Sequence, residues 1–267
     1  MVDRSDLDAL LTKAARHPIR GWDFRWLREE GRFREDPLPW NYLEMVAGRA
    51  HRSPDLLDLG TGGGELLATI SPHPPLTVAT ESYPPNVRVA AQRLAPMGIH
   101  VVQTSGAPDN NEQRGIGSKG SLPFRAGSFH LVVDRNEAYL ARDVARVLAP
   151  GGVFLTEQSG SAEIPEFYRL FGMDPPPDPS PRWDLGLATA QVVAAGLDPL
   201  GGGEATSAMN FHDVGALAWY LMAAPWVLPG FSVERYRPRL EQLHSKIADH
   251  GPIRIPRYAF WLEARKE

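Results

Sequence analysis

The residues with the clearest chemical potential form a glycine-rich turn. An apolar run over residues 56–59 leads into Gly60-Thr61-Gly62-Gly63-Gly64, and a helical pattern follows over residues 66–70. Glycine permits positive φ and lets a ligand approach the backbone closely. The start of the predicted helix would offer unpaired N–H groups and a positive dipole end to an anionic group. We therefore interpret this strand, turn and helix as a ligand-binding unit rather than a plain connection.

A carboxylate follows the next predicted strand. The apolar, β-branched run Leu76–Thr80 leads directly into Glu81, which lies 21 residues after Gly60. Such spacing places an acid at the C-terminal end of the neighbouring strand, where it can accept hydrogen bonds from a ribose diol. The two features together predict a nucleoside site at one edge of a parallel sheet.

Three segments resemble the class I S-adenosylmethionine-dependent methyltransferases. The run Asp58–Gly64 matches their E/D-x-G-x-G-x-G loop, with Asp58 as the acid. Residues 121–133 resemble their LPF…GSFDLV segment, with His130 where Asp is usual, and residues 146–152 resemble RVLKPGG. A nicotinamide dehydrogenase would more often carry G-x-G-x-x-G, but residue 65 is Glu.

The resemblance implies S-adenosylmethionine as cofactor and S-adenosylhomocysteine as product. The glycine turn would face the methionine part, Asp58 its amino group or a bound water, and Glu81 the ribose hydroxyls. The family's usual adenine-binding acid is missing after the third strand, and Asp109 is a candidate substitute. The implied cofactor-binding residues are Asp58, Gly60, Thr61, Gly62, Gly64, Glu81 and Ser82, then Ser105, Gly106, Ala107 and Leu122 around the adenine, and Asp134, Arg135 and Asn136 near the methyl group.

The elements that must position these residues predict an α/β protein with a Rossmann-like, doubly wound, mostly parallel sheet. The resemblance implies that a last strand over residues 258–264 is antiparallel and lies between strands five and six. Residues 1–50 are expected to form an N-terminal helical, aromatic cap segment, and residues 51–267 the methyltransferase domain, with lid-like helices at about 211–250. Other expected strands are 99–103, 129–133, 153–156 and 204–209; other expected helices are 84–95, 139–148, 163–171 and 185–195.

The general base that would remove a proton from the methyl acceptor is less well defined. Methyl transfer is an in-line displacement at the sulfonium methyl, in which the protein supplies position and electrostatics. Candidate bases are His212, Glu137 and Tyr139, with His130 and Tyr258 behind them; a general base must reach the acceptor proton. His212 is also typical of a structural histidine, and a reaction driven by proximity needs no base. Without cysteine or a paired-histidine motif, no metal site is predicted.

The composition and charge of the chain indicate which classes of partner to expect. The chain has 267 residues, a net charge of −4 and no cysteine, which suits one α/β domain with no global attraction to nucleic acid. No apolar stretch of about 18 residues occurs, so we expect a cytoplasmic protein with no membrane partner. We favour a small-molecule acceptor. The alternatives are an RNA methyltransferase, because seven arginines lie among aromatics between residues 4 and 34, and a cofactor-binding homologue without catalysis.

Overall fold

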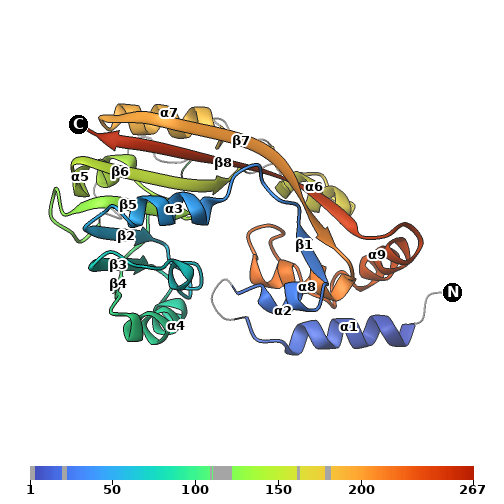
Figure 1. Cartoon of the computed structure of the whole chain (residues 1–267). Coiled ribbons are helices and arrows are strands. Elements are labelled where there is room, and N and C mark those ends of the chain that lie inside the picture. Colours follow the sequence, from blue (N-terminus) through green and yellow to red (C-terminus); the bar gives the residue numbers. More distant parts are fainter. Residues whose placement is uncertain (1–3, 20–22, 109, 111–121, 161–162, 178–181) are drawn as a thin grey trace.

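The computed structural model describes residues 4–19, 23–108, 110, 122–160, 163–177 and 182–267. Figure 1 shows one long, curled sheet with helices on both sides. The strands are β1 (Phe33–Glu35), β2 (Asp55–Leu59), β3 (Leu76–Glu81), β4 (His100–Gln103), β5 (Phe129–Arg135), β6 (Leu148–Ser159), β7 (Leu197–Phe211) and β8 (Ile253–Lys266). Within the described residues they form a sheet in the order β1-β7-β8-β6-β5-β2-β3-β4.

The helices lie between these strands in the chain. They are α1 (Arg4–Arg16), α2 (Arg25–Glu29), α3 (Tyr42–Ala50), α4 (Pro84–Leu94), α5 (Ala141–Val147), α6 (Glu163–Leu170), α7 (Leu185–Ala194), α8 (Val214–Ala223) and α9 (Arg237–His250), with 3-10 turns η1 (Leu67–Thr69) and η2 (Ala95–Met97). Of the helices described, none combines the length and the apolar character needed to cross a bilayer.

The sheet topology confirms the predicted fold class. Strands β2 to β6 pair in parallel with their neighbours, whereas β8 is antiparallel to both β6 and β7 and lies between them. The short strand β1, which the sequence did not predict, pairs antiparallel with the end of β7. A mostly parallel sheet with an antiparallel last strand is therefore present.

Both faces of the inner parallel strands β2, β3 and β5 are largely buried, as is usual for parallel sheets, whereas the edge strand β4 is partly exposed. Alternate residues point to opposite sides, so Leu56 packs in a cluster with α3 and α4, and Leu57 packs in a second cluster with α5 and α7. The central β5 alternates in the same way, with Leu131 on the first side and Val132 on the second. This arrangement is the doubly wound pattern that the sequence predicted.

Two local predictions were wrong. The helix expected after the glycine turn is only the short 3-10 turn η1, because Pro72, Pro74 and Pro75 follow and cannot donate helical hydrogen bonds. The strand expected over residues 153–156 begins earlier. The helix α5 ends at Val147, and β6 begins at Leu148 with a register shift against β5.

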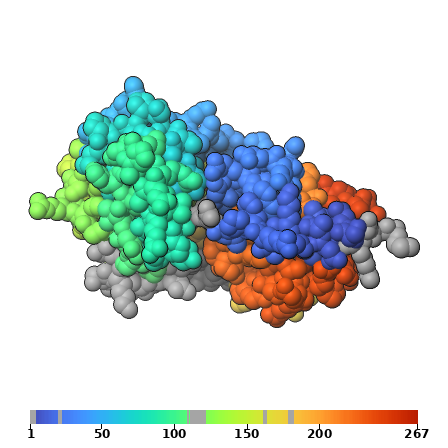
Figure 2. All heavy atoms as spheres, turned by 90° about the horizontal axis from the view of Figure 1, so that it is seen from below, coloured from blue at the N-terminus to red at the C-terminus, as the bar shows by residue number. Residues whose placement is uncertain are grey.

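A helical cap stands at one end of the sheet. We define the cap as α1, α2, β1, α8 and α9; in Figure 2, α1 and α2 (blue) lie against the orange and red helices at one end of the molecule. The strands β7 and β8 carry it, because their pairing continues to Phe211 and Ile253, beyond the last pair of β6 at Ser159. Since β7 runs parallel to β6, the cap lies at the carboxyl edge of the parallel strands.

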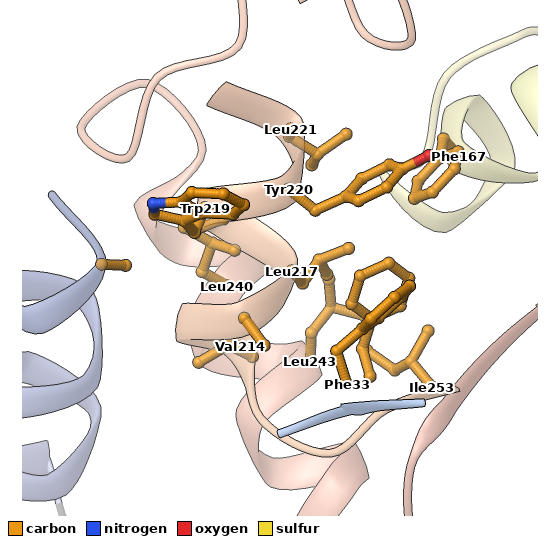
Figure 3. Packing of buried hydrophobic residues seen from close by; sticks show 14 of the residues in the cluster. Phe33, Phe167, Val214, Leu217, Trp219, Tyr220, Leu221, Leu240, Leu243 and Ile253 are labelled. Carbon is orange, nitrogen blue, oxygen red and sulfur yellow. The ribbon is translucent and has the colours of Figure 1, made fainter. Parts of the chain in front are cut away.

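The cap has its own apolar core, which Figure 3 shows from close by. Trp219 and Leu217 of α8 are buried with Leu240 of α9 and Phe33 of β1. A buried ion pair joins Arg32, just before β1, to Asp213 at the start of α8, with Nη2 and Oδ1 2.7 Å apart. The N-terminal segment and the helices predicted as a lid thus pack around one core. The division into residues 1–50 and 51–267 stays a prediction.

Candidate functional site

A pocket lies where the carboxyl ends of the first parallel strands meet, which is the usual ligand position in open α/β sheets. The space inside it is about 30 Å³. The pocket collects residues from the ends of β2, β3 and β5, from the segment after β4, and from α5. Its lining residues are Leu59, Gly60, Thr80, Glu81, Ser82, Thr104, Gly106, Ala107, Leu122, Glu137, Ala138, Tyr139, Leu140, Asp143 and Val144.

The glycine turn is held in place by its neighbours. Gly60, Gly62 and Gly64 all have positive φ, at 61°, 62° and 77°, a region that disfavours side chains with a Cβ. The backbone N–H of Thr61 donates to the carbonyl of Thr80 over 2.8 Å. The turn is therefore fixed against β3, and its shape depends on residues without side chains.

An arginine fixes the turn from α4. Arg93 donates to the carbonyl of Gly63 and forms an ion pair with Glu65, with Nη1 and Oε1 2.6 Å apart. Arg93 therefore holds the glycine turn against α4.

Glu81 is oriented by the backbone. Its Oε1 accepts hydrogen bonds from the N–H groups of Ser82 and Tyr83, each over 2.8 Å. The residue as a whole is only 5% exposed. No described residue donates a hydrogen bond to Oε2. A carboxylate held in this way presents its second oxygen to a ligand at the pocket wall.

The pocket is acidic. Among the described residues, its lining includes Glu81, Glu137 and Asp143 and no Lys, Arg or His. Burial, together with the charges of Glu81 and Asp58, raises the pKa of Glu137 to about 7. Asp58 lies behind the wall at the end of β2, and burial raises its pKa to about 7, with the charge of Glu81 acting in the same direction. Such a site suits a cationic or neutral ligand and opposes a polyanion.

Six of the predicted cofactor residues line the pocket: Gly60, Glu81, Ser82, Gly106, Ala107 and Leu122. Asp58, Thr61, Gly62, Gly64 and Ser105 belong to the same segments but stand outside the lining. Asp109 and the segment 111–121 lie outside the described residues. The adenine-binding role of Asp109 therefore stays a prediction.

The segment predicted to hold the methionine end lies away from the pocket. Asp134 is completely buried, accepts hydrogen bonds from Thr156 and Gln158, and has its pKa raised by burial. Arg135 pairs with Glu157 at 2.8 Å. Asn136 is exposed, with a φ of 60°. The reason is that β5 continues through Arg135, so the chain first reaches the pocket at Glu137.

The candidate bases are dispersed. Tyr139 lines the pocket, but its ring packs edge-on against Phe154 at 4.9 Å between centroids, and burial raises its pKa, which keeps the phenol neutral. His212 is exposed at the start of α8 in the cap and does not line the pocket. Among the three primary candidates, the pocket therefore presents one carboxyl, that of Glu137.

Sequence reasoning missed the contribution of α5. Asp143 lines the pocket, accepts the N–H of Leu122 over 3.0 Å and pairs with Arg146 at 3.1 Å. The Asp-x-x-Arg spacing on a predicted helix was the available signal. Across the described residues, no group of three or more His, Asp or Glu side chains is arranged to hold a metal ion.

Comparisons with known proteins agree with this architecture. No protein-family model matches the chain, and no curated protein matches it significantly. Among solved structures, YcgJ from Bacillus subtilis is 19% identical with a TM-score of 0.55, covering 85% of this chain and 98% of that chain.

Two further structures bear methyltransferase descriptions. A protein from Bacillus halodurans C-125, assigned as a methyltransferase, is 16% identical with a TM-score of 0.52, covering 98% and 99% of the two chains. A protein from Galdieria sulphuraria, assigned as a sarcosine dimethylglycine methyltransferase, is 15% identical with a TM-score of 0.50, covering 98% of each. The chain therefore has the fold of the class I S-adenosylmethionine-dependent methyltransferases.

Proposed function

We propose that this protein is a methyltransferase that uses S-adenosylmethionine and transfers the methyl group to a small molecule. The observation that carries the proposal is the pocket itself, in which a glycine turn and a backbone-fixed Glu81 meet and the described lining residues include no basic side chain. The turn admits a ligand close to its backbone, and the free Oε2 of Glu81 suits a ribose diol.

The residues present fit the cofactor. Glu81 would bind the ribose hydroxyls, and Gly106, Ala107, Leu122 and Val144 would enclose the adenine with their small or apolar surfaces. When bound, the cofactor supplies an activated methyl group. The protein's part is to orient the cofactor and to exclude water, which are the main contributions that a methyl transfer requires.

The acidic lining argues against a nicotinamide dinucleotide. A pyrophosphate is usually bound at a helix N-terminus after the glycine turn. Here a single 3-10 turn follows, and the pocket wall carries carboxylates instead of basic groups. A sulfonium nucleoside carries a positive charge at sulfur and avoids this conflict.

The structure of the cap favours a small acceptor over RNA. Phe24 and Phe33 of the N-terminal segment are buried in the cap core and cannot stack on bases. Several of its arginines are engaged in ion pairs: Arg25 with Asp23, Arg28 with Glu35 and Arg32 with Asp213. The segment then contributes to packing rather than to a basic surface.

No general base is assigned to the acceptor side. The phenol of Tyr139 is a core group, and His212 stands in the cap away from the pocket lining. A transfer that relies on proximity and desolvation is consistent with this arrangement.

The first test is calorimetric titration with S-adenosylmethionine, S-adenosylhomocysteine, NAD and ATP. We expect heat from the first two only. Glu81→Gln should weaken both by roughly 10- to 150-fold, the loss of a charged hydrogen bond worth about 1.5–3 kcal/mol. Glu204→Gln, on β7 outside the pocket lining, is the matched control and should bind as the wild type does. Absence of heat with both nucleosides would overturn the proposal.

The second test separates the functional alternatives. Transfer of a labelled methyl group to members of a small-molecule panel would establish catalysis on that class. Cofactor binding without transfer to any acceptor would favour a non-catalytic homologue. Binding of RNA with a steep salt dependence would instead favour the nucleic-acid alternative.

A further inference from the structure

The side chain of Glu137 covers the glycine turn. Its Cγ, Cβ and Cδ atoms lie 2.4, 2.5 and 2.6 Å from the point that a Cβ on Gly60 would occupy. The carboxyl group has no hydrogen-bond or ion-pair partner among the described residues, whereas the backbone of Glu137 is bonded: its carbonyl accepts from Gln158 and its N–H donates to Asp134. Glu137 thus occupies the bare backbone surface that a nucleoside would need.

The groups that face Glu137 from neighbouring elements are acidic or neutral. They are Asp58 on β2, Glu81 on β3, Asp134 on β5, Asp143 on α5 and the phenol of Tyr139. Two arginines on adjoining elements are already paired with other carboxylates, Arg93 with Glu65 and Arg135 with Glu157. In the part of the chain that the structure describes, the pocket lining therefore has an excess of acid and carries no cation.

We propose that Glu137 is the residue by which the pocket distinguishes the charged sulfonium cofactor from its neutral thioether product. This inference rests on the proposed function. It changes the role of Glu137 from a base for the acceptor to a group that recognises the charge of the cofactor. The ribose, the adenine and the amino-acid end are common to both nucleosides, so contacts with them cannot make this distinction.

Binding of the sulfonium cofactor is coupled to release of a proton from Glu137. Near neutral pH the Glu137 carboxyl of the empty pocket is partly protonated, since burial and the charges of Glu81 and Asp58 raise its pKa to about 7. When the sulfonium enters, Glu137 moves off Gly60, its O–H proton passes to the buffer, and the carboxylate faces the cation. After methyl transfer the sulfur is neutral, so the carboxylate takes a proton back and the product is held less tightly.

The experiment compares S-adenosylmethionine with S-adenosylhomocysteine by calorimetry in two buffers of different ionisation enthalpy. The wild type should bind the sulfonium with additional proton release and with an affinity ratio over the thioether of about tenfold. This ratio should increase from about pH 6 to about pH 7.5, as Glu137 ionises. In Glu137→Gln, the ratio should fall towards one and the additional proton release should disappear.

One other carboxylate of the pocket serves as a control. Asp143→Asn removes an acid that already contacts Leu122 and Arg146. It should leave the affinity ratio and the proton count unchanged, whatever it does to overall affinity.

The outcomes separate this inference from the proposed function. If the wild type binds both nucleosides equally with equal proton release, or if Glu137→Gln keeps the ratio, the inference is overturned while the function stands. If neither nucleoside binds the wild type, both are overturned. Asp58→Asn removes the other carboxyl whose pKa is raised to about 7, and it should retain the additional proton release. Loss of that release in Asp58→Asn would assign the proton to Asp58 and overturn the inference, whether or not Glu137→Gln folds.

Discussion

Asp58 offers a direct test of the electrostatics of the pocket. Its carboxyl is buried at the end of β2, and burial raises its pKa from 3.8 to about 7. Between these two values the folded chain binds more protons than the unfolded chain, so the free energy of unfolding falls as the pH rises. The neutral carboxyl of Asp58 carries no ionisation cost below about pH 4, and the stability that this represents is lost once the pH passes about 7.

The magnitude follows from the two pKa values. At about 1.4 kcal/mol per pKa unit, ionising Asp58 in the folded state costs at most about 4 kcal/mol. About 3 kcal/mol of this cost is incurred between about pH 5 and about pH 8. Asp58→Asn retains the shape and cannot ionise. We therefore expect the stability difference between the variant and the wild type to grow in favour of the variant by about 3 kcal/mol over this range.

The assay is urea unfolding followed by tryptophan fluorescence at pH values across this range. The matched control is Asp213→Asn, a carboxylate outside the pocket that pairs with Arg32 and caps α8 at the N–H of Ala216. The control should lower stability by a similar amount at each pH in this range. Parallel pH profiles for Asp58→Asn and the wild type would refute the reasoning, because Asp58 would then be ionised in the folded state without cost.

Three further predictions concern the turn and the cap. Gly60→Ala places a Cβ at positive φ and 2.4 Å from the Cγ of Glu137, so both stability, by about 1–2 kcal/mol, and the affinity for S-adenosylhomocysteine should fall in urea unfolding and calorimetry. Arg32→Ala leaves Asp213 without its buried partner and should lower the free energy of unfolding by about 3–5 kcal/mol. Arg93→Ala releases the glycine turn from α4, so the affinity for S-adenosylhomocysteine should fall by about 10-fold, a lost charged hydrogen bond, while the circular dichroism spectrum stays unchanged.

The sequence was most informative about the parallel strands. Runs such as Leu76–Thr80 are apolar on both sides, and this property belongs to strands covered by helices on both faces. The antiparallel position of β8 came from the family resemblance. The strand β1 was not foreseen, because three residues carry no periodic pattern and pair only with the distant end of β7.

For the candidate site, residues at strand ends were easier to predict than residues on helices. Gly60 and Glu81 line the pocket because each ends a parallel strand, and all such ends meet at one edge. Asp143 and Val144 reach the pocket through the orientation of α5, which chain spacing does not reveal. The same limit applies to Asp134, since the sequence did not show that β5 extends two residues further, to Arg135, before the chain turns.

The cap and the pocket are connected through the charges of the N-terminal segment. The charge of Arg93, which holds the glycine turn, acts on Asp23 just before α2, and the charge of Glu65 acts on Arg25. The cap is also continuous with the sheet, because β7 and β8 extend into it beyond the end of β6. A ligand in the pocket would therefore meet the sheet on one side and be close to the segment leading to the cap on the other. We therefore expect the proposed acceptor to lie between the cap and the carboxyl edge of β5 and β6, rather than on the outer surface.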